Sequence, residues 1–405
     1  MTQMSLADRF FVDAMSPAFR EDPYPHYDAY RGQHRLLRVA DTMWLALGHA
    51  DVTTMLRHPK LSSDERRATS QIGGPEPGRL ETSLVFMDPP DHTRLRGLVA
   101  RAFTAKRVAD LRPAAETITA RLLDETEAAG ARGEVVDLIC SLAYPLPVRM
   151  ICLLMGVPVA DEDAFTGWSR SLARTLDPSV LRSAETDAAI AAAETELAGY
   201  LEALLSFRRT NPGDDLLSAL LAVEADGDRI SPREVVDLAL LLLVAGHETT
   251  VNLIGNGLLA LHCHLDQLRR LREEPSLTAN AIEEFLRFDS SVQLTGRVAL
   301  EDVVVGETPV PKGEGVLCLL GAANRDPSVY PDPDRLDITR PNIRPLSFGG
   351  GIHFCLGAQL ARIEAEVAIA TLLRRLPGLT LDDPEHADWR PTFVLRGLNR
   401  LPASW

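Results

Sequence analysis

The longest apolar pattern in the chain predicts a buried central helix. Ser231, Pro232 and Glu234 suit the N-cap, the first turn and the capping-box position at its start. The residues from Leu238 to Val244 are then apolar on nearly every face. A helix of this kind belongs in the interior of a large domain. We therefore expect a long helix over about residues 231–262.

The other apolar segments are shorter and predict further helices with small β-sheets. Residues 36–39 and 44–47 suit strands, and residues 303–306 with 309–313 suit a hairpin. Residues 114–209 have helical patterns broken by turn residues. Between residues 60 and 83 the chain is polar and rich in glycine and proline, which predicts a long functional loop. The expected fold class is mainly α with small β-sheets, in one large domain over residues 1–405.

Composition and charge narrow the possible classes of protein. The 405 residues are 45% hydrophobic and 24% charged, which suits a large globular core. The net charge of −15 disfavours nucleic-acid binding, which needs a basic surface. The first residues lack an apolar signal-peptide core, and the apolar run from Leu238 to Gly246 is too short to cross a bilayer. We expect a cytoplasmic protein that binds neither nucleic acid nor membrane.

One of the five cysteines lies in a distinctive loop. An odd number of cysteines without CxxC spacing indicates reduced thiols rather than a disulfide framework or a structural zinc site. Cys355 follows three glycines, Gly349 to Gly351, and precedes a helical pattern whose positive end favours thiolate. Phe348 and Phe354 add apolar bulk beside it. The loop over residues 347–357 therefore predicts a shielded, anionic sulfur suited to a soft or redox metal.

Polar residues interrupt the central helix at Gly246-His247-Glu248-Thr249. A buried carboxylate is costly unless it has a partner or a role, so Glu248 is a candidate functional residue. His247 and Glu248 could begin the HExxH motif of zinc proteases, but Val251 stands where the second histidine is needed, and this excludes such a site. A purely structural ion pair at Glu248 remains an alternative.

These two segments resemble cytochromes P450. The pattern Phe-Gly-Gly-Gly-x-His-x-Cys-x-Gly over residues 348–357 is similar to the haem-binding loop of that family, and Ala-Gly-x-Glu-Thr over residues 245–249 is similar to its central-helix motif. The resemblance extends over essentially the whole chain and is greatest to soluble actinomycete enzymes that hydroxylate macrolides and other natural products. It implies the cytochrome P450 fold, a long helix over haem b, and a monooxygenase that uses O₂ as co-substrate.

The resemblance also implies roles for individual residues. Cys355 would be the single protein ligand to the haem iron, Gly246 would make room for O₂, Thr249 would donate a hydrogen bond to it, and Glu248 would relay protons. His92 and Arg96 lie four residues apart, and therefore on one face of a helix. The residues implied to bind the haem propionates are His92, Arg96, Arg297 and His353, and the others implied to contact the haem are Ala245, Phe348, Gly349 and Gly357.

A third motif has an expected structural role. Glu284 and Arg287 are three residues apart and can pair on one helix face. The resemblance implies that this pair is buried and tied to an arginine from a later Pro-x-Arg-Phe segment. Here that segment reads Pro333-Asp334-Arg335-Leu336, so leucine replaces the usual phenylalanine and Arg335 is the expected third member. The three residues would support the cysteine loop.

A basic cluster suggests an acidic protein partner. Residues 91–112 contain six cations and two carboxylates, a net charge of +4 in a chain of −15. The cations are Arg94, Arg96, Arg101, Lys106, Arg107 and Arg112, and the carboxylates are Asp91 and Asp110. The resemblance implies that this region receives a ferredoxin, which is reduced by its ferredoxin reductase. We expect the protein itself to be a monomer.

The substrate is the least constrained part of this interpretation. The expected pocket residues are Ser83, Val85, Val292, Gln293, Leu294, Thr295, Val394 and Leu395. Hydroxyl and amide groups among them suit an oxygenated macrolide or polyketide of secondary metabolism, such as antibiotic biosynthesis. A steroid or terpenoid is an alternative substrate. Two further alternatives are a peroxygenase driven by H₂O₂, which the acid and hydroxyl of Glu248 and Thr249 disfavour, and a non-enzymatic haem-thiolate sensor.

Overall fold

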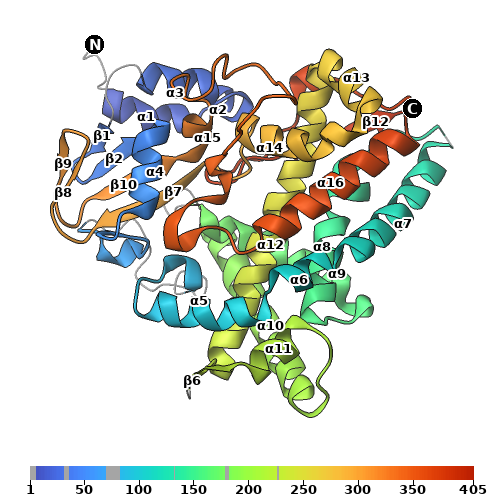
Figure 1. Ribbon diagram of the computed structural model, residues 1–405, viewed down its shortest axis with the longest axis horizontal. Coiled ribbons are helices and arrows are strands. Elements are labelled where there is room, and N and C mark those ends of the chain that lie inside the picture. Colours follow the sequence, from blue (N-terminus) through green and yellow to red (C-terminus); the bar gives the residue numbers. More distant parts are fainter. Residues whose placement is uncertain (1–5, 32–35, 70–82, 132, 178–181, 226–227) are drawn as a thin grey trace.

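The computed structural model describes the whole chain except residues 1–5, 32–35, 70–82, 132, 178–181 and 226–227 (Figure 1). The α-helices are α1 Leu6–Ala14, α2 Pro17–Glu21, α3 Tyr24–Arg31, α4 His49–Arg57, α5 Asp91–Ala102, α6 Ala105–Ala109, α7 Arg112–Gly130, α8 Pro145–Met155, α9 Glu162–Leu172, α10 Ala184–Thr210, α11 Leu216–Ala222, α12 Pro232–Cys263, α13 Leu265–Glu273, α14 Thr278–Phe288, α15 Leu320–Asn324 and α16 Ala358–Arg375. The strands are β1 Leu36–Ala40, β2 Met43–Ala46, β3 Leu61–Ser62, β4 Val136–Asp137, β5 Glu224–Ala225, β6 Asp228–Arg229, β7 Leu294–Ala299, β8 Val303–Val305, β9 Thr308–Val310, β10 Gly315–Leu319, β11 Thr380–Leu381 and β12 Pro402–Ser404.

Helix α12 runs through the middle of the molecule, as the apolar pattern predicted (Figure 1). It begins with the expected capping box: the Ser231 hydroxyl accepts a hydrogen bond from the Glu234 backbone at 3.2 Å, and the Glu234 carboxylate accepts one from the Ser231 backbone at 2.7 Å. In the described part of the chain it is the one helix long and apolar enough to cross a membrane, yet 78% of its apolar window is buried inside the protein. It is therefore a core helix.

Other helices surround α12 and form the main core with it. Helices α8, α10, α14 and α16 pack against α12, and their apolar side chains join one continuous cluster. Helix α14 approaches closely at Gly257, where an added Cβ would lie 2.8 Å from Cδ2 of the buried Phe285. Glycine at this position lets the two helices meet.

The strands form small sheets, as expected. The largest has the order β1-β2-β10-β7-β3, with β2 and β10 parallel and the other neighbours antiparallel. The N-terminal segment packs against this sheet through a cluster that includes Phe10, Tyr27, Leu45 and Leu294. The predicted hairpin is β8–β9. Most of the predicted loop over residues 60–83 lies outside the described residues.

The contact at Gly257 gives a test of core packing. We expect Gly257→Ala to lower the free energy of unfolding by about 1–3 kcal/mol, because its methyl group would press on Phe285. Gly199→Ala is the matched control, since Gly199 lies within α10 with nothing within 4 Å of an added Cβ. This control should raise stability by about 0.5–1 kcal/mol through helix propensity alone. Denaturant unfolding would measure both, and equal effects would contradict the packing argument.

Candidate active site

The cysteine loop is a glycine-dependent turn that ends at helix α16. Gly349 and Gly351 have φ angles of +66° and +65°, which side chains with a Cβ rarely adopt. A Cβ at Gly351 would also collide with the Leu56 carbonyl oxygen at the end of α4. The Cys355 backbone N–H donates to the Phe348 carbonyl at 2.9 Å and closes the loop. The glycines therefore hold the cysteine against the start of α16.

The Cys355 side chain is half-buried, and desolvation outweighs the surrounding groups that favour its thiolate. Burial raises the pKa of Cys355, although backbone N–H groups of Gly357 and Ala358 and the charges of Arg96 and Arg362 act to lower it. The predicted bias toward thiolate is thus outweighed by desolvation in the protein alone. A metal cation bound to the sulfur would reverse this balance.

The two phenylalanines of the loop differ in their surroundings. Phe348 is half-buried against the main core and stacks under the Arg362 guanidinium, 4.5 Å from the ring centre. Phe354 is 44% exposed, and its neighbour Ile352 is 52% exposed. Phe354 is therefore only partly available to shield the sulfur, although its ring packs edge-on against Phe348 at 6.3 Å between ring centres.

Four basic side chains gather around the loop without an anionic partner. The His92 and His353 rings lie 4.3 Å apart, and Arg96 donates to the Phe354 carbonyl at 2.5 Å. Arg297 donates to the Gly296 carbonyl at 2.6 Å, and His92 Nε2 is buried without a partner in the described part of the chain. Among the described residues, none of the four pairs with a carboxylate.

The pKa values of this cluster show the cost of crowding cations. Burial, followed by the charges of His92, Arg297 and Arg96, lowers the pKa of His353 to about 3. Burial and Arg96 also lower the pKa of His92, and burial lowers that of Arg297. Carboxylates of a bound group would relieve this repulsion, so the cluster fits the two propionates of a haem.

Helix α12 presents two different faces at its polar motif. Ala245 is exposed and Gly246 and Thr249 are half-buried, although neighbouring turns of the helix are buried. The Thr249 hydroxyl donates to the Ala245 carbonyl at 2.9 Å. An added Cβ at Gly246 would lie 3.3 Å from Ile151 of α8, so this glycine also serves helix packing, a role that the sequence did not predict.

Glu248, on the buried side of α12, has two charged partners. Its Oε1 lies 3.2 Å from His247 Nε2, and its Oε2 forms an ion pair with Arg390. Burial would raise the pKa of Glu248, but His247 and Arg390 outweigh burial and lower it to about 2. The carboxylate is therefore ionised. Arg390 was missed by sequence analysis, because nothing in its local sequence indicates a partner 142 residues away.

Comparison with known proteins identifies the family. The sequence profile described as Cytochrome P450 matches residues 39–398. The chain belongs to the cytochrome P450 family. It is 45% identical over 399 residues to a vitamin D(3) 25-hydroxylase of Pseudonocardia autotrophica, which covers 97% of this chain and 96% of that protein. It is 40% identical over 405 residues to 6-deoxyerythronolide B hydroxylase of Saccharopolyspora erythraea, with coverage of 96% and 98%.

A solved structure agrees with this membership. The ligand-free CYP164A2 of Mycobacterium smegmatis superposes with a TM-score of 0.88 at 40% identity, over 98% of this chain and 100% of that one. The predicted fold class is confirmed. The protein is a monooxygenase of the cytochrome P450 type, and the family uses a haem-thiolate iron cofactor, O₂ and redox partners.

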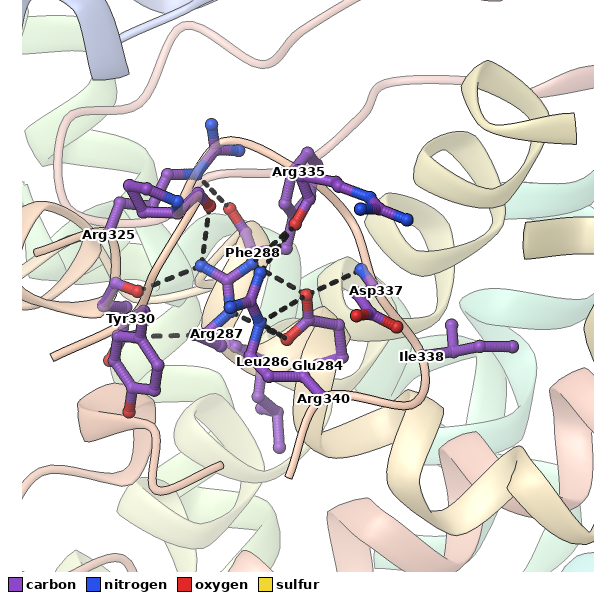
Figure 2. Close-up of polar contacts among 12 residues, drawn as sticks. Glu284, Leu286, Arg287, Phe288, Arg325, Tyr330, Arg335, Asp337, Ile338 and Arg340 are labelled. Carbon is purple, nitrogen blue, oxygen red and sulfur yellow. Dashed lines mark hydrogen bonds and ion pairs between the residues drawn. The ribbon is translucent and has the colours of Figure 1, made fainter. Parts of the chain in front are cut away.

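The buried Glu284–Arg287 pair of this cytochrome P450 is at the centre of a polar network (Figure 2). Both side chains are fully buried and form two hydrogen bonds of 2.7 and 2.8 Å. Arg287 also donates to the carbonyls of Asn324 and Pro333. Asn324 in turn binds the Leu346 backbone and the Ser347 hydroxyl, at 2.7 and 2.8 Å. The pair thus supports the segment that leads into the cysteine loop.

The third member of the network is Arg340, and the prediction of Arg335 is wrong. Arg340 Nε lies 3.4 Å from Glu284, and its guanidinium also binds three backbone carbonyls. Arg335 contributes only its carbonyl oxygen, while its exposed guanidinium is turned away (Figure 2). The Pro-x-Arg spacing pointed to the wrong residue because the segment from Arg335 to Arg340 is irregular and bends around Glu284, which brings the Arg340 side chain to the carboxylate.

The expected pocket residues do not all face one space. Gln293 bonds to the Tyr27 hydroxyl at 3.0 Å and to the Ser290 carbonyl at 2.7 Å, so its amide is occupied. Leu294 and Val394 pack in the N-terminal cluster. The structure contradicts the pocket role of Gln293 and Leu294, because both side chains are buried against the N-terminal segment. Val394 is half-buried, and its pocket role stays a prediction. The other candidates are Ser83, whose hydroxyl is buried without a partner among the described residues, Val85, Val292, Thr295 and Leu395.

The predicted basic cluster is largely neutralised by partners within the protein. Its ion pairs are Arg94 with Glu234 and Asp228, Lys106 with Asp110, Arg107 with Asp214, and Arg112 with Glu366. Arg96 points toward the cysteine loop. Arg101 is exposed and forms no ion pair in the described part of the chain. The expected +4 face is therefore much weaker than its sequence suggested.

The corrected network can be tested by paired substitutions. We expect Arg340→Ala to lower the free energy of unfolding by about 2–3 kcal/mol, because it leaves Glu284 and three carbonyls with fewer donors. Arg335→Ala should change it by less than about 0.5 kcal/mol, since the carbonyl it contributes is kept. Thermal or denaturant unfolding of both variants is the measurement. If Arg335→Ala lowered the free energy of unfolding more than Arg340→Ala does, Arg335 would again be the third member of the network.

Proposed function

We propose that this cytochrome P450 binds haem b through Cys355 and hydroxylates, or epoxidises, a hydrophobic natural product. The observation that carries the proposal is the cysteine loop with its four basic side chains, none of which forms an ion pair with a carboxylate among the described residues. Cys355 supplies a sulfur ligand, and His92, Arg96, Arg297 and His353 match the two propionates. Ala245, Phe348, Gly349 and Gly357 are the remaining residues assigned to the haem.

The bound haem supplies the oxygen chemistry: with a thiolate ligand it activates O₂ and inserts one oxygen atom into a C–H bond. The residues of this chain position the reactants and move protons. Thr249 presents a hydroxyl on the accessible face of α12. The next residue, Thr250, donates its hydroxyl hydrogen to the carbonyl of Gly246, one turn earlier in the helix. Glu248 delivers protons from the buried face. Activation of O₂ needs protons while bulk water is kept out, and a single carboxyl group such as Glu248 within an otherwise apolar helix suits that requirement.

The substrate class follows from relatives and from the remaining pocket residues. The relatives are named for hydroxylation of 6-deoxyerythronolide B and of vitamin D(3). Val85 and Val292 offer apolar surface, while Ser83 and Thr295 offer hydroxyls. We assign a macrolide or polyketide substrate in secondary metabolism, with a steroid-like molecule as the second candidate. A substrate-induced haem spin shift, titrated with a macrolactone and with vitamin D(3), discriminates between them.

For electron supply we assign a ferredoxin and its reductase, and we place docking at the exposed side of the cysteine loop. Ile352 and Phe354 form an apolar centre next to Cys355. Arg57, at the end of α4 beside Gly351, and Arg101, in the last turn of α5, are exposed cations without ion pairs among the described residues. A small apolar centre with flanking cations suits a transient contact with an acidic protein.

The iron ligand can be tested with Cys355→Ser. We expect this variant to lose the red-shifted absorption band that CO gives with reduced thiolate haem, because a serine oxygen cannot replace the sulfur. The measurement is the CO difference spectrum at matched haem content. Cys152→Ser is the control, since Cys152 is buried in the main core and should leave the band in place. Persistence of the band in Cys355→Ser would overturn the assignment.

The role of Thr249 can be tested against its neighbour. Thr249→Ala should lower the amount of product per NADH consumed and raise peroxide release several-fold, because the hydroxyl on the accessible face is lost. Thr250→Ala removes a hydroxyl that is buried on the other face, where it donates to the Gly246 carbonyl, and should leave coupling at the native level. Equal coupling in the two variants would count against Thr249.

The docking surface can be tested by charge reversal. Arg101→Glu should slow reduction by ferredoxin about tenfold or more at low salt and weaken its salt dependence. Lys106→Glu should have a smaller effect, since the charge of Lys106 is already offset by Asp110. Stopped-flow reduction over a range of ionic strength is the measurement. Full turnover with H₂O₂ and no ferredoxin would instead favour a peroxygenase.

A further inference from the structure

Arg362, in the second turn of α16, packs against the cysteine loop but has no part in the haem cluster described above. Its guanidinium carbon lies 4.5 Å from the centre of the Phe348 ring. Its Nη1 donates to the Ala358 carbonyl at 3.3 Å. The backbone carbonyl of the same Phe348 accepts the hydrogen bond of the Cys355 N–H. The guanidinium is therefore stacked on the residue that closes the loop around the sulfur.

Glu283 fixes the Arg362 guanidinium through both of its carboxylate oxygens. Arg362 Nε binds Oε1, and Nη2 donates to Oε2 at 3.0 Å. Two parallel bonds of this kind hold a planar guanidinium in one orientation. Glu283 lies in α14 next to Glu284 of the buried network, and α14 packs against α16. Arg362 is thus anchored to the helix whose buried pair supports the cysteine loop.

The Glu283–Arg362 pair is only partly open to solvent. The side chain of Arg362 is 29% exposed and that of Glu283 is 24% exposed. A guanidinium stacked on an aromatic ring is weakly hydrated, and the charge of a partly buried group is screened less than that of an exposed one. The charge of Arg362 acts to lower the pKa of Cys355, so its field reaches the sulfur. The loop therefore has a fixed positive charge beside it.

Arg362 differs from the basic side chains that we assign to the haem propionates. Those four side chains have no carboxylate partner among the described residues, whereas Arg362 already has one in Glu283. It therefore does not need the carboxylates of a bound group to balance its charge. Two roles fit such a pair: a contact that only stabilises the packing of α14 on α16, or a charge that acts on the sulfur and its metal.

We propose that Arg362, held in place by Glu283 as a positioning residue, raises the reduction potential of the bound haem. The proposal rests on the proposed function, since it takes Cys355 as the iron ligand. The step concerned is the uptake of one electron from the reduced ferredoxin, in which no bond forms or breaks. Reduction adds one negative charge to the haem and its sulfur ligand. A fixed positive charge nearby favours the reduced form.

The first test is a potentiometric titration of the haem-loaded protein. Arg362→Gln removes the charge but keeps an N–H donor for Glu283. It should lower the equilibrium constant for one-electron reduction about tenfold, which is about 59 mV in potential. Arg362→Lys keeps the charge without the planar fork and should recover most of that shift. A native potential in Arg362→Gln would overturn the proposal.

The second test uses the opposite charge of the same pair. Glu283→Gln removes the negative charge, and its amide oxygen can still accept a hydrogen bond from Arg362. The potential should rise, because the charge of Arg362 is then no longer offset by its partner. A contact that only stabilises the packing would lower the free energy of unfolding in both variants without moving the potential in opposite directions. A potential in Glu283→Gln that falls or stays native would overturn the proposal.

Arg375→Gln is the matched control on the same helix. Arg375 is the last residue of α16, about 20 Å along the helix from Arg362, and it pairs with Glu127 and Asp124. Its loss should leave the potential at the native value. An equal shift in Arg375→Gln and Arg362→Gln would overturn the proposal, because the potential would then follow the net charge of the protein rather than the charge beside the loop.

The CO difference spectrum separates failure of this proposal from failure of the function on which it rests. The red-shifted band should be present in the native protein and unchanged in Arg362→Gln, since the sulfur ligand is kept. If the native protein lacked the band, the assignment of Cys355 would be wrong and this proposal would fall with it. If the band is present and the potential of Arg362→Gln is native, only the role of Arg362 is overturned.

Discussion

The structure depends most on the need to satisfy two fully buried charges, Glu284 and Arg287. A buried ion pair is tolerated only where surrounding groups complete its hydrogen bonds. Arg287 and Arg340 therefore draw backbone carbonyls of the irregular segment over residues 324–335 around Glu284. Asn324 carries this order to Leu346 and Ser347, where the cysteine loop begins. Without that network the loop would have no rigid support on this side.

The same cost of burying charge appears in two opposite forms at the active site. Glu248 is balanced by protein groups, because His247 and Arg390 bind its two oxygens. The basic side chains near the cysteine loop have no such balance among the described residues, and their pKa values are lowered accordingly. The protein thus neutralises Glu248 with its own side chains, whereas the cations near the cysteine loop need the carboxylates of a bound group. This asymmetry is what makes the loop suited to haem.

The basic residues of the segment 91–112 are mostly neutralised at the protein surface, and this affects how a partner protein would bind. Four of the six cations in residues 91–112 are paired with nearby carboxylates, so the strong local charge of the sequence is mostly cancelled. Exposed apolar side chains at Ile352 and Phe354 remain in the cysteine loop, with the exposed Arg57 beside Gly351 and the exposed Arg101 in the last turn of α5. A partner would therefore recognise a small apolar patch with few free charges rather than a broad basic face.

The sequence by itself determined the local features. Ser231 and Glu234 predicted the start of α12, its apolar residues predicted its burial, and the glycines before Cys355 predicted a tight loop, because each depends on a few neighbouring residues. Tertiary structure alone decided the long-range pairings: Arg340 rather than Arg335 at Glu284, Arg390 at Glu248, and Tyr27 at Gln293. These contacts join residues 56 to 266 positions apart. Such pairs depend on how the helices and irregular segments pack, and no local pattern of charge or hydrophobicity specifies that.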